Sequence, residues 1–133
     1  MNWELNSDRP VWLQLVEHLQ RAVVAGQLGP GSRVPPVREL ASEAAVNPNT
    51  MQRALGELEA QGLLVAQRTS GRFVTQDTDR IGEVRRQLAQ AQVKEFLDRM
   101  EKLGFDPAQT GRLVEEQLKE GEHETDIGMP GTL

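Results

Sequence analysis

The 133-residue chain contains no cysteine and no tyrosine, and only three phenylalanines and two tryptophans. Without cysteine it can form neither a disulfide framework nor a thiolate metal site. No apolar run approaches the roughly 18 residues of a membrane-spanning helix, and the N-terminus lacks the basic and apolar regions of a secretion signal. The core must therefore be built from Leu, Val and Ala, and we expect a soluble cytoplasmic protein without a membrane partner.

Catalytic motifs are also missing. The sequence has no G-x-S-x-G, no P-loop and no paired histidines. His18 is a lone histidine on a predicted helix, where a satisfied or exposed side chain is expected over a ligand. His123 lies between two glutamates in a predicted tail, with no second histidine nearby. We therefore expect no enzyme, no metal site and no cofactor.

The net charge of −5 at pH 7 is carried by the C-terminal part of the chain. Residues 1–76 hold seven arginines, no lysine and seven acidic residues, whereas residues 77–133 hold eight basic and thirteen acidic residues. A neutral N-terminal part can still present a basic face if its arginines cluster. Arginine also has a planar fork that suits phosphate or guanine. The acidic balance therefore does not exclude a nucleic-acid partner.

Residues 1–76 predict three helices followed by a hairpin. Pro10 suits a first helical turn, Gly26 a stop, and Asn47-Pro48 an N-cap followed by a first-turn proline. Gly62 ends the third helix, and the run 68–71 joins two short strands. The predicted helices span about 10–26, 37–45 and 48–61, and the strands 63–67 and 72–75. This order is typical of a winged helix-turn-helix domain.

Residues 77–120 predict a helical hairpin. A long helix covers about 80–103, and Asp106 to Gln109 forms a capping box for a second helix that ends near Glu120. Leu113, Val114 and Leu118 are expected to face inward. Residues 121–133 are polar and rich in glycine, so we expect a flexible tail. The fold class is mainly α with a small β-hairpin, a winged helix-turn-helix followed by a two-helix dimerisation hairpin.

The predicted third helix has one apolar side, centred on Met51, Leu55 and Leu58. Its outer face is polar and carries no acidic residue before Glu57; it consists of Asn49, Thr50, Gln52, Arg53, Gly56 and Ala60. Asn and Gln side chains can pair with adenine edges, and Arg with guanine. From the residues alone, a DNA-reading face and an ordinary solvated face are equally compatible with this pattern.

The order of residues carries more information than composition. The relevant stretches are P-V-W-L-Q at 10–14, G-Q-L-G-P-G-S-R-V-P at 26–35, V-R-E-L-A at 37–41, V-N-P-N-T at 46–50, L-E-A-Q-G-L at 58–63 and G-R-F-V at 71–74. Together they resemble the GntR family of bacterial regulators over about residues 9–75, with essentially no gaps. The short C-terminal part resembles the YtrA-type subfamily, whose members have a small dimerisation region in place of a ligand-binding domain.

The resemblance implies a set of DNA contacts. In the family an arginine of the second helix and the start of the recognition helix contact DNA, and the wing tip enters the minor groove. The matching positions are Arg38, then Asn47, Asn49, Thr50, Gln52 and Arg53, then Arg68, Thr69, Ser70, Gly71 and Arg72. On spacing alone, Arg38 could instead pair with Glu39 or Glu43. The sequence departs from the family at Pro36, Thr69 and Arg72, where serine, glycine and threonine are common.

The predicted long helix carries two apolar stripes, rotated by about a third of a turn. The first consists of Ile81, Val84, Leu88 and Ala91, and the second of Val93, Phe96, Leu97, Met100 and Leu103. A hairpin of two helices can cover only one stripe, so the other needs the winged domain or a second copy. We favour a symmetric dimer, with an interface of Ile81, Val84, Leu88, Phe96, Leu97 and Met100.

The leading hypothesis is a sequence-specific transcriptional regulator that binds double-stranded operator DNA as a homodimer. A repressor and a palindromic operator are favoured. One alternative is a winged-helix module for protein–protein contact. Another is an enzyme with a DNA-binding module, for which 133 residues leave no room. Trp12 is expected to pack the first helix. A small-molecule effector, if there is one, would have to bind between subunits or domains.

Overall fold

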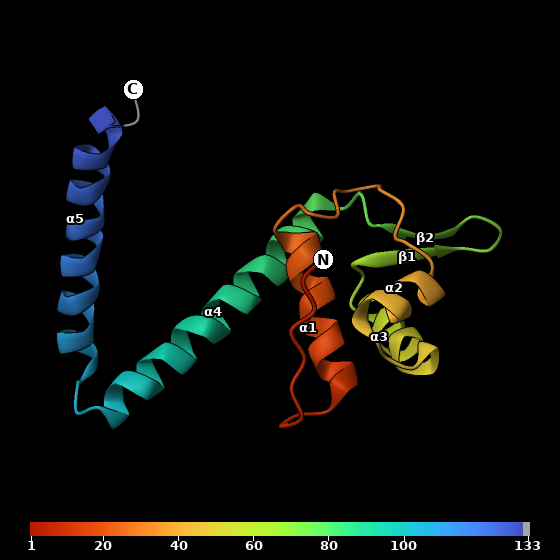
Figure 1. The fold of residues 1–133 in the computed structure, drawn as a ribbon, viewed down its shortest axis with the longest axis horizontal. Helices are drawn as coiled ribbons and strands as arrows, with labels where there is room; N and C mark the ends of the chain where they lie inside the picture. Colours follow the sequence, from red (N-terminus) through yellow and green to blue (C-terminus); the bar gives the residue numbers. More distant parts are fainter. Residues whose placement is uncertain (132–133) are drawn as a thin grey trace. The chain divides into compact units, whose positions relative to one another are not determined.

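The computed structural model describes the backbone of residues 1–131 and the side chains of residues 1–122. The chain forms two compact units, residues 1–87 and 88–133. Its elements are α1 (Val11–Val24), α2 (Val37–Ala44), α3 (Pro48–Ala60), β1 (Leu64–Gln67), β2 (Gly71–Val74), α4 (Thr78–Lys102) and α5 (Pro107–Gly131) (Figure 1). This order confirms the predicted fold class, mainly helical with one hairpin.

The helices of the first unit begin and end at local signals that the sequence predicts. The Asn47 side chain caps α3 by accepting a hydrogen bond from the backbone N–H of Asn49, at 2.7 Å. After α3 the chain turns at Gly62, whose φ of 79° is a conformation that glycine adopts at little cost. Pro36 gives α2 no side-chain cap, and Ala45 ends α2 in the left-handed region with φ 57°.

The core of the first unit lies between α1, α2, α3 and β1. α3 is at its centre, since it packs against α1, α2 and β1. The largest apolar side chains that are fully buried there are Leu15, Leu19, Leu40, Met51, Leu55, Leu58, Leu63, Val23 and Val74. Burying one such side chain stabilises a fold by about 1.5–3 kcal/mol. The inner side of α3 is thus held firmly, which fixes the direction of its outer side.

The hairpin β1–β2 is antiparallel, with Leu64 opposite Val74 and Gln67 opposite Gly71. Its loop extends away from the helices (Figure 1). Residues 31–34 run beside β2 on its other edge: the Val34 N–H donates to the Arg72 carbonyl at 2.8 Å. This second line of backbone hydrogen bonds ties the wing to the segment that leads into α2.

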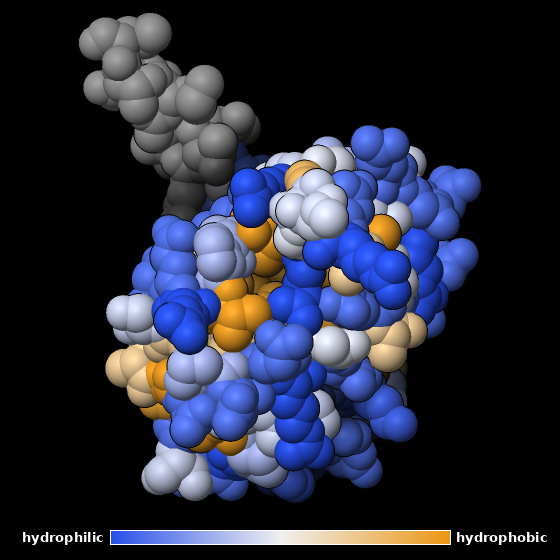
Figure 2. All heavy atoms as spheres, turned by 90° about the vertical axis from the view of Figure 1, so that its right-hand side faces the viewer, coloured by the Kyte–Doolittle hydropathy of each residue, from blue (hydrophilic) through white to orange (hydrophobic). Residues whose placement is uncertain are grey.

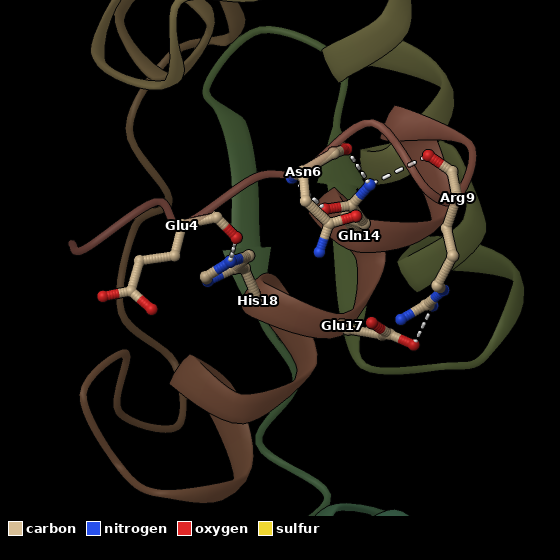
Figure 3. A network of polar contacts seen from close by, with 6 residues as sticks. All are labelled: Glu4, Asn6, Arg9, Gln14, Glu17 and His18. Atoms are coloured by element: carbon tan, nitrogen blue, oxygen red, sulfur yellow. Dashed lines mark hydrogen bonds and ion pairs between the residues drawn. The ribbon is translucent and has the colours of Figure 1, made fainter.

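The N-terminal segment, residues 1–9, runs alongside α1 and is held by side chains of α1 (Figures 1 and 3). The buried Gln14 amide donates to the carbonyls of Asn6 and Arg9 at 2.8 and 2.9 Å, and accepts from the Asn6 N–H at 2.9 Å. His18 packs against Trp3 with the two rings tilted, their centroids 5.4 Å apart. The sequence did not predict this ordered segment, because its contacts are made to a helix that follows it.

The first turns of α4 belong to the first unit. Ile81 and Val84 are only 8% and 4% exposed, and the Arg80 guanidinium donates to the Gln61 carbonyl at 2.8 Å. The unit therefore ends at residue 87, later than the predicted boundary at 76. Both side chains are buried within their own chain, and the dimerisation role expected for Ile81 and Val84 stays a prediction.

The second unit contains the rest of α4 and α5. Asp106 and Gln109 form the predicted capping box, each side chain accepting from the other residue's backbone N–H at 2.8 and 2.9 Å. α5 continues to Gly131, past the predicted end at Glu120. The tail expected at residues 121–133 is described only in part. The structure does not describe the side chains of residues 123–131, among them His123, or any part of residues 132–133.

The second unit leaves an apolar groove open between α4 and α5. Phe96 and Met100 line it from α4, and Leu113, Val114 and Leu118 from α5. Val114 and Leu118 line this groove but are 38% and 64% exposed, so the side of α5 that the sequence predicts to face inward is only partly covered. Two helices alone offer too little surface to cover both apolar faces. No helix of the described residues is long and apolar enough to cross a membrane.

Candidate nucleic-acid interface

The outer side of α3 is the first part of the candidate interface. Asn49, Gln52 and Arg53 are exposed, and Thr50 is half-buried. The opposite side of the same helix carries Met51, Ala54, Leu55 and Leu58, none of which is measurably exposed. The predicted division between an inner apolar and an outer polar side is therefore confirmed. The polar donors and acceptors lie together on the side that a groove could receive.

Arg53 does not extend freely into solvent. Its guanidinium carbon lies 3.9 Å from the centre of the Trp12 ring, in a cation–π contact that joins α3 to the first turn of α1. Trp12 is half-buried, which agrees with the predicted packing role on α1. The contact with Arg53 was not predicted, because the two residues lie 41 positions apart.

Arg38 is the second residue of α2 and is exposed. Within residues 1–122 it forms no ion pair and no side-chain hydrogen bond, so it pairs neither with Glu39 nor with Glu43. Glu43 lies 3.8 Å from the amino group of Met1 instead. This result removes the alternative that spacing left open for Arg38, and leaves its guanidinium available to a ligand.

The wing loop is exposed along its length. Arg68, Thr69, Ser70 and Gly71 all lie on the surface, and Gly71 has φ 98°, which favours glycine. Arg72 differs from these four residues. Its guanidinium pairs with Glu59 of α3, and the Arg72 side chain is only 18% exposed. Arg72 therefore holds the wing against α3. Fewer of its N–H donors remain available for the predicted DNA contact, because the guanidinium is paired with Glu59.

Arg33 is a candidate that sequence reasoning missed. It is exposed, forms a β-bridge with Phe73, and lies beside the wing. A Cβ built on Gly71 would lie 3.5 Å from an Arg33 guanidinium nitrogen, so this cation sits against the base of the loop. The signal in the sequence was its position just before Val34-Pro35-Pro36, an extended segment able to pair with a strand.

The face toward which the wing loop extends is mostly hydrophilic, with small apolar areas between the polar residues (Figure 2). No three His, Cys, Asp or Glu side chains within the described residues gather in a way that could hold a metal ion. The surface combines donor-rich side chains on α3, unpaired arginines and an exposed wing. Such a surface is suited to binding a polyanion, because its cations and donors can pair with phosphates.

The pair α2–α3, packed on its apolar sides and carrying a donor-rich second helix beside a hairpin, defines a winged helix-turn-helix, the fold of a DNA-binding transcriptional regulator. The model of the bacterial regulatory proteins of the gntR family matches residues 13–74. The chain belongs to the GntR family, as the resemblance in its sequence predicts.

Related proteins support this membership over most of the chain. The regulator YhcF of Bacillus subtilis is 31% identical over 121 residues, which cover 91% of this chain and 93% of YhcF. The repressor YtrA of the same organism is 32% identical over 71 residues, 53% of this chain and 55% of YtrA. A solved GntR-family regulator from Listeria monocytogenes superposes with a TM-score of 0.78 at 30% identity, covering 84% of this chain and 98% of that one.

Proposed function

We propose that this regulator acts as a repressor that binds a palindromic operator as a homodimer, with α3 in the major groove. The observation that carries the proposal is the two-sided character of α3. Its inner side is fully buried, so Asn49, Gln52 and Arg53 are held on a rigid element facing outward. Rigid presentation lowers the entropy lost when side chains meet base edges and phosphates.

The wing and α2 extend the proposed contact beyond α3. Arg68 and Gly71 in the loop, together with Arg33 at its base, would approach the adjacent minor groove. Arg38 would approach the backbone beside the major groove. Cations at these places suit phosphates and narrow minor grooves, which carry concentrated negative potential. Such contacts fix the register of α3 on the duplex without reading sequence themselves.

A dimer is part of this proposal because of the apolar groove in the second unit. Phe96, Met100, Val114 and Leu118 would be covered by the same residues of a second copy, which gives an isologous interface. Leu88 and Leu97, half-buried and 37% exposed, extend the apolar surface along α4. Two joined winged units would read half-sites about one helical turn apart.

Repression is the simplest outcome of such binding, because occupying a promoter is sufficient to block it. The name of YtrA describes that protein as a repressor, which favours the same role here. The proposed target is operator DNA, and a protein that binds it would act in the cytoplasm. A winged module for protein–protein contact is the second candidate, and it would bind DNA weakly and with little dependence on salt.

Selection of bound duplexes from a random library, at stated salt, tests the proposal directly. We expect a palindromic motif, and an affinity for it that falls steeply with salt because counterions are released from neutralised phosphates. A pool with no enriched motif and a flat salt response would sink the proposal and favour the protein–protein candidate. Sedimentation of the complex then gives the number of chains per duplex.

A further inference from the structure

The contact between Trp12 and Arg53 joins the first turn of α1 to the outer side of α3. The guanidinium carbon of Arg53 lies over the Trp12 ring, 3.9 Å from the ring centre. Both neighbours of Trp12 are open to solvent: Val11 is 37% and Leu13 36% exposed. The pair therefore lies at the surface where α1 borders α3.

Stacking and hydrogen bonding use different parts of a guanidinium. The five N–H donors of the group lie in its plane and point outward from its edge, whereas a ring attracts the cation through the flat face. Arg53 forms no ion pair with any side chain in residues 1–122. The cation over the ring thus keeps donors available, while the ring restricts the rotamers that an exposed arginine would otherwise sample.

The position of the pair indicates what those donors would meet. If α3 enters a groove, the elements packed beside α3 lie against the wall of that groove, and the wall is made of phosphates. Trp12 holds the Arg53 cation toward α1, and so toward the wall and away from the base edges. A guanidinium fork binds a phosphate through two parallel hydrogen bonds.

We propose that Trp12 and Arg53 form one phosphate-binding unit, in which Arg53 contacts a backbone phosphate of the operator and Trp12 is its positioning residue. The inference rests on the proposed function and deepens it. It assigns Arg53 to the backbone, and leaves sequence reading to Asn49 and Gln52. It also assigns to α1 a role in DNA binding that its sequence alone does not suggest.

A double-mutant cycle on the full chain tests the unit, with affinity for the selected duplex as the readout. Trp12→Leu removes the ring but keeps an apolar side chain, and Arg53→Gln removes the cation. We expect Trp12→Leu to weaken binding about two- to five-fold when Arg53 is present, and to have no effect in the Arg53→Gln background. Trp12→Phe, which keeps an aromatic face, should retain most of the affinity.

Two further measurements separate a phosphate from a base. Arg53→Gln should lower the slope of log affinity against log salt by about one, and leave the base preference unchanged. Relaxed preference at one base pair would overturn the phosphate assignment. Val11→Ala, on the same turn of α1, is the control and should bind like the wild type, and circular dichroism checks the fold.

The outcomes distinguish this inference from the proposed function. If the wild-type chain enriches no DNA motif, the proposed function fails and this inference fails with it. If the wild type binds a motif but Trp12→Leu weakens binding equally with and without Arg53, only the positioning role is overturned. An unchanged affinity for Trp12→Leu in the wild-type background overturns it as well.

Discussion

The two units of the chain differ in what they do with their apolar residues. The first unit buries most of its large apolar side chains among α1, α2, α3 and the hairpin, and Leu55 and Leu58 are not measurably exposed. The second unit leaves Val93, Leu103 and Leu118 at 56%, 71% and 64% exposure. The first unit thus has a core of its own. The second unit leaves much of its apolar surface uncovered, which under the proposed function a second copy of the chain would cover.

The largest effect is expected in the core of the first unit. Leu55→Ala should lower the free energy of unfolding by about 2–5 kcal/mol, because it leaves a cavity under the proposed recognition helix. Chemical denaturation followed by circular dichroism measures this. Val65→Ala, at a hairpin position that is 47% exposed, is the control and should change stability by about 0.5 kcal/mol or less. A small loss at Leu55 would contradict a self-sufficient core.

A charge placed in the apolar groove of the second unit should dissociate the proposed dimer. Phe96→Glu or Leu118→Glu places a carboxylate in the proposed interface, and we expect sedimentation to show monomers. Operator affinity should fall on the order of 10²-fold, since the second winged unit is no longer tethered. The far-ultraviolet spectrum of the winged unit should be preserved.

Lys119→Glu, on the other side of α5 by helical spacing, is the matched control for the groove variants and should leave the dimer intact. Dimers that persist in both groove variants would show that the apolar groove has another role. Leu88→Glu then tests whether the α4 surface contributes to the association.

Substituting an arginine should affect operator affinity more in the first unit than in the second. Arg38→Ala removes an exposed and unpaired cation from the candidate interface, and should weaken operator binding by about 1–3 kcal/mol with stability unchanged. Arg99→Ala is the control, because Arg99 is exposed in the second unit beside Glu95. Equal effects of the two substitutions in a binding titration would mean that charge alone, and not position, determines affinity.

The smallest effect concerns the cap of α3. Asn47→Ala should cost about 1 kcal/mol of stability, because the Asn49 N–H loses its acceptor. Asn47→Asp should keep the cap and the stability, but weaken DNA binding by placing a negative charge next to phosphates. Comparing the two variants by thermal unfolding and by binding separates the structural role of Asn47 from its predicted DNA contact. If Asp binds as well as Asn, Asn47 lies away from the backbone.

Secondary structure was predictable because its signals are local. Pro48 after an asparagine cap, Gly62 after α3 and the Asp106 capping box each act within a few residues of the helix end they define. The inner and outer sides of α3 followed from the 3.6-residue period in the same way. The end of α5 was predicted too early, because the run after Glu120 is polar and begins with Gly121, and these local signals do not end the helix in the structure.

The candidate site was predictable in part. Arg38 and the polar residues of α3 are exposed where the sequence placed them, whereas Arg72 is engaged by Glu59 and Arg33 stands beside the wing. Which arginine remains available depends on its partner in space. Glu59 and Arg72 are 13 positions apart, and no local sequence pattern predicts their ion pair.

The chain's own order of residues determined its helices, its turns and its family, because periodicity, capping and glycine geometry operate over a few neighbouring positions. Tertiary structure alone decided that Ile81 and Val84 complete the first unit, that the N-terminal segment packs on α1, and that Trp12 holds Arg53. These outcomes depend on contacts between residues distant in sequence. Such contacts exist only once the core has brought the elements together.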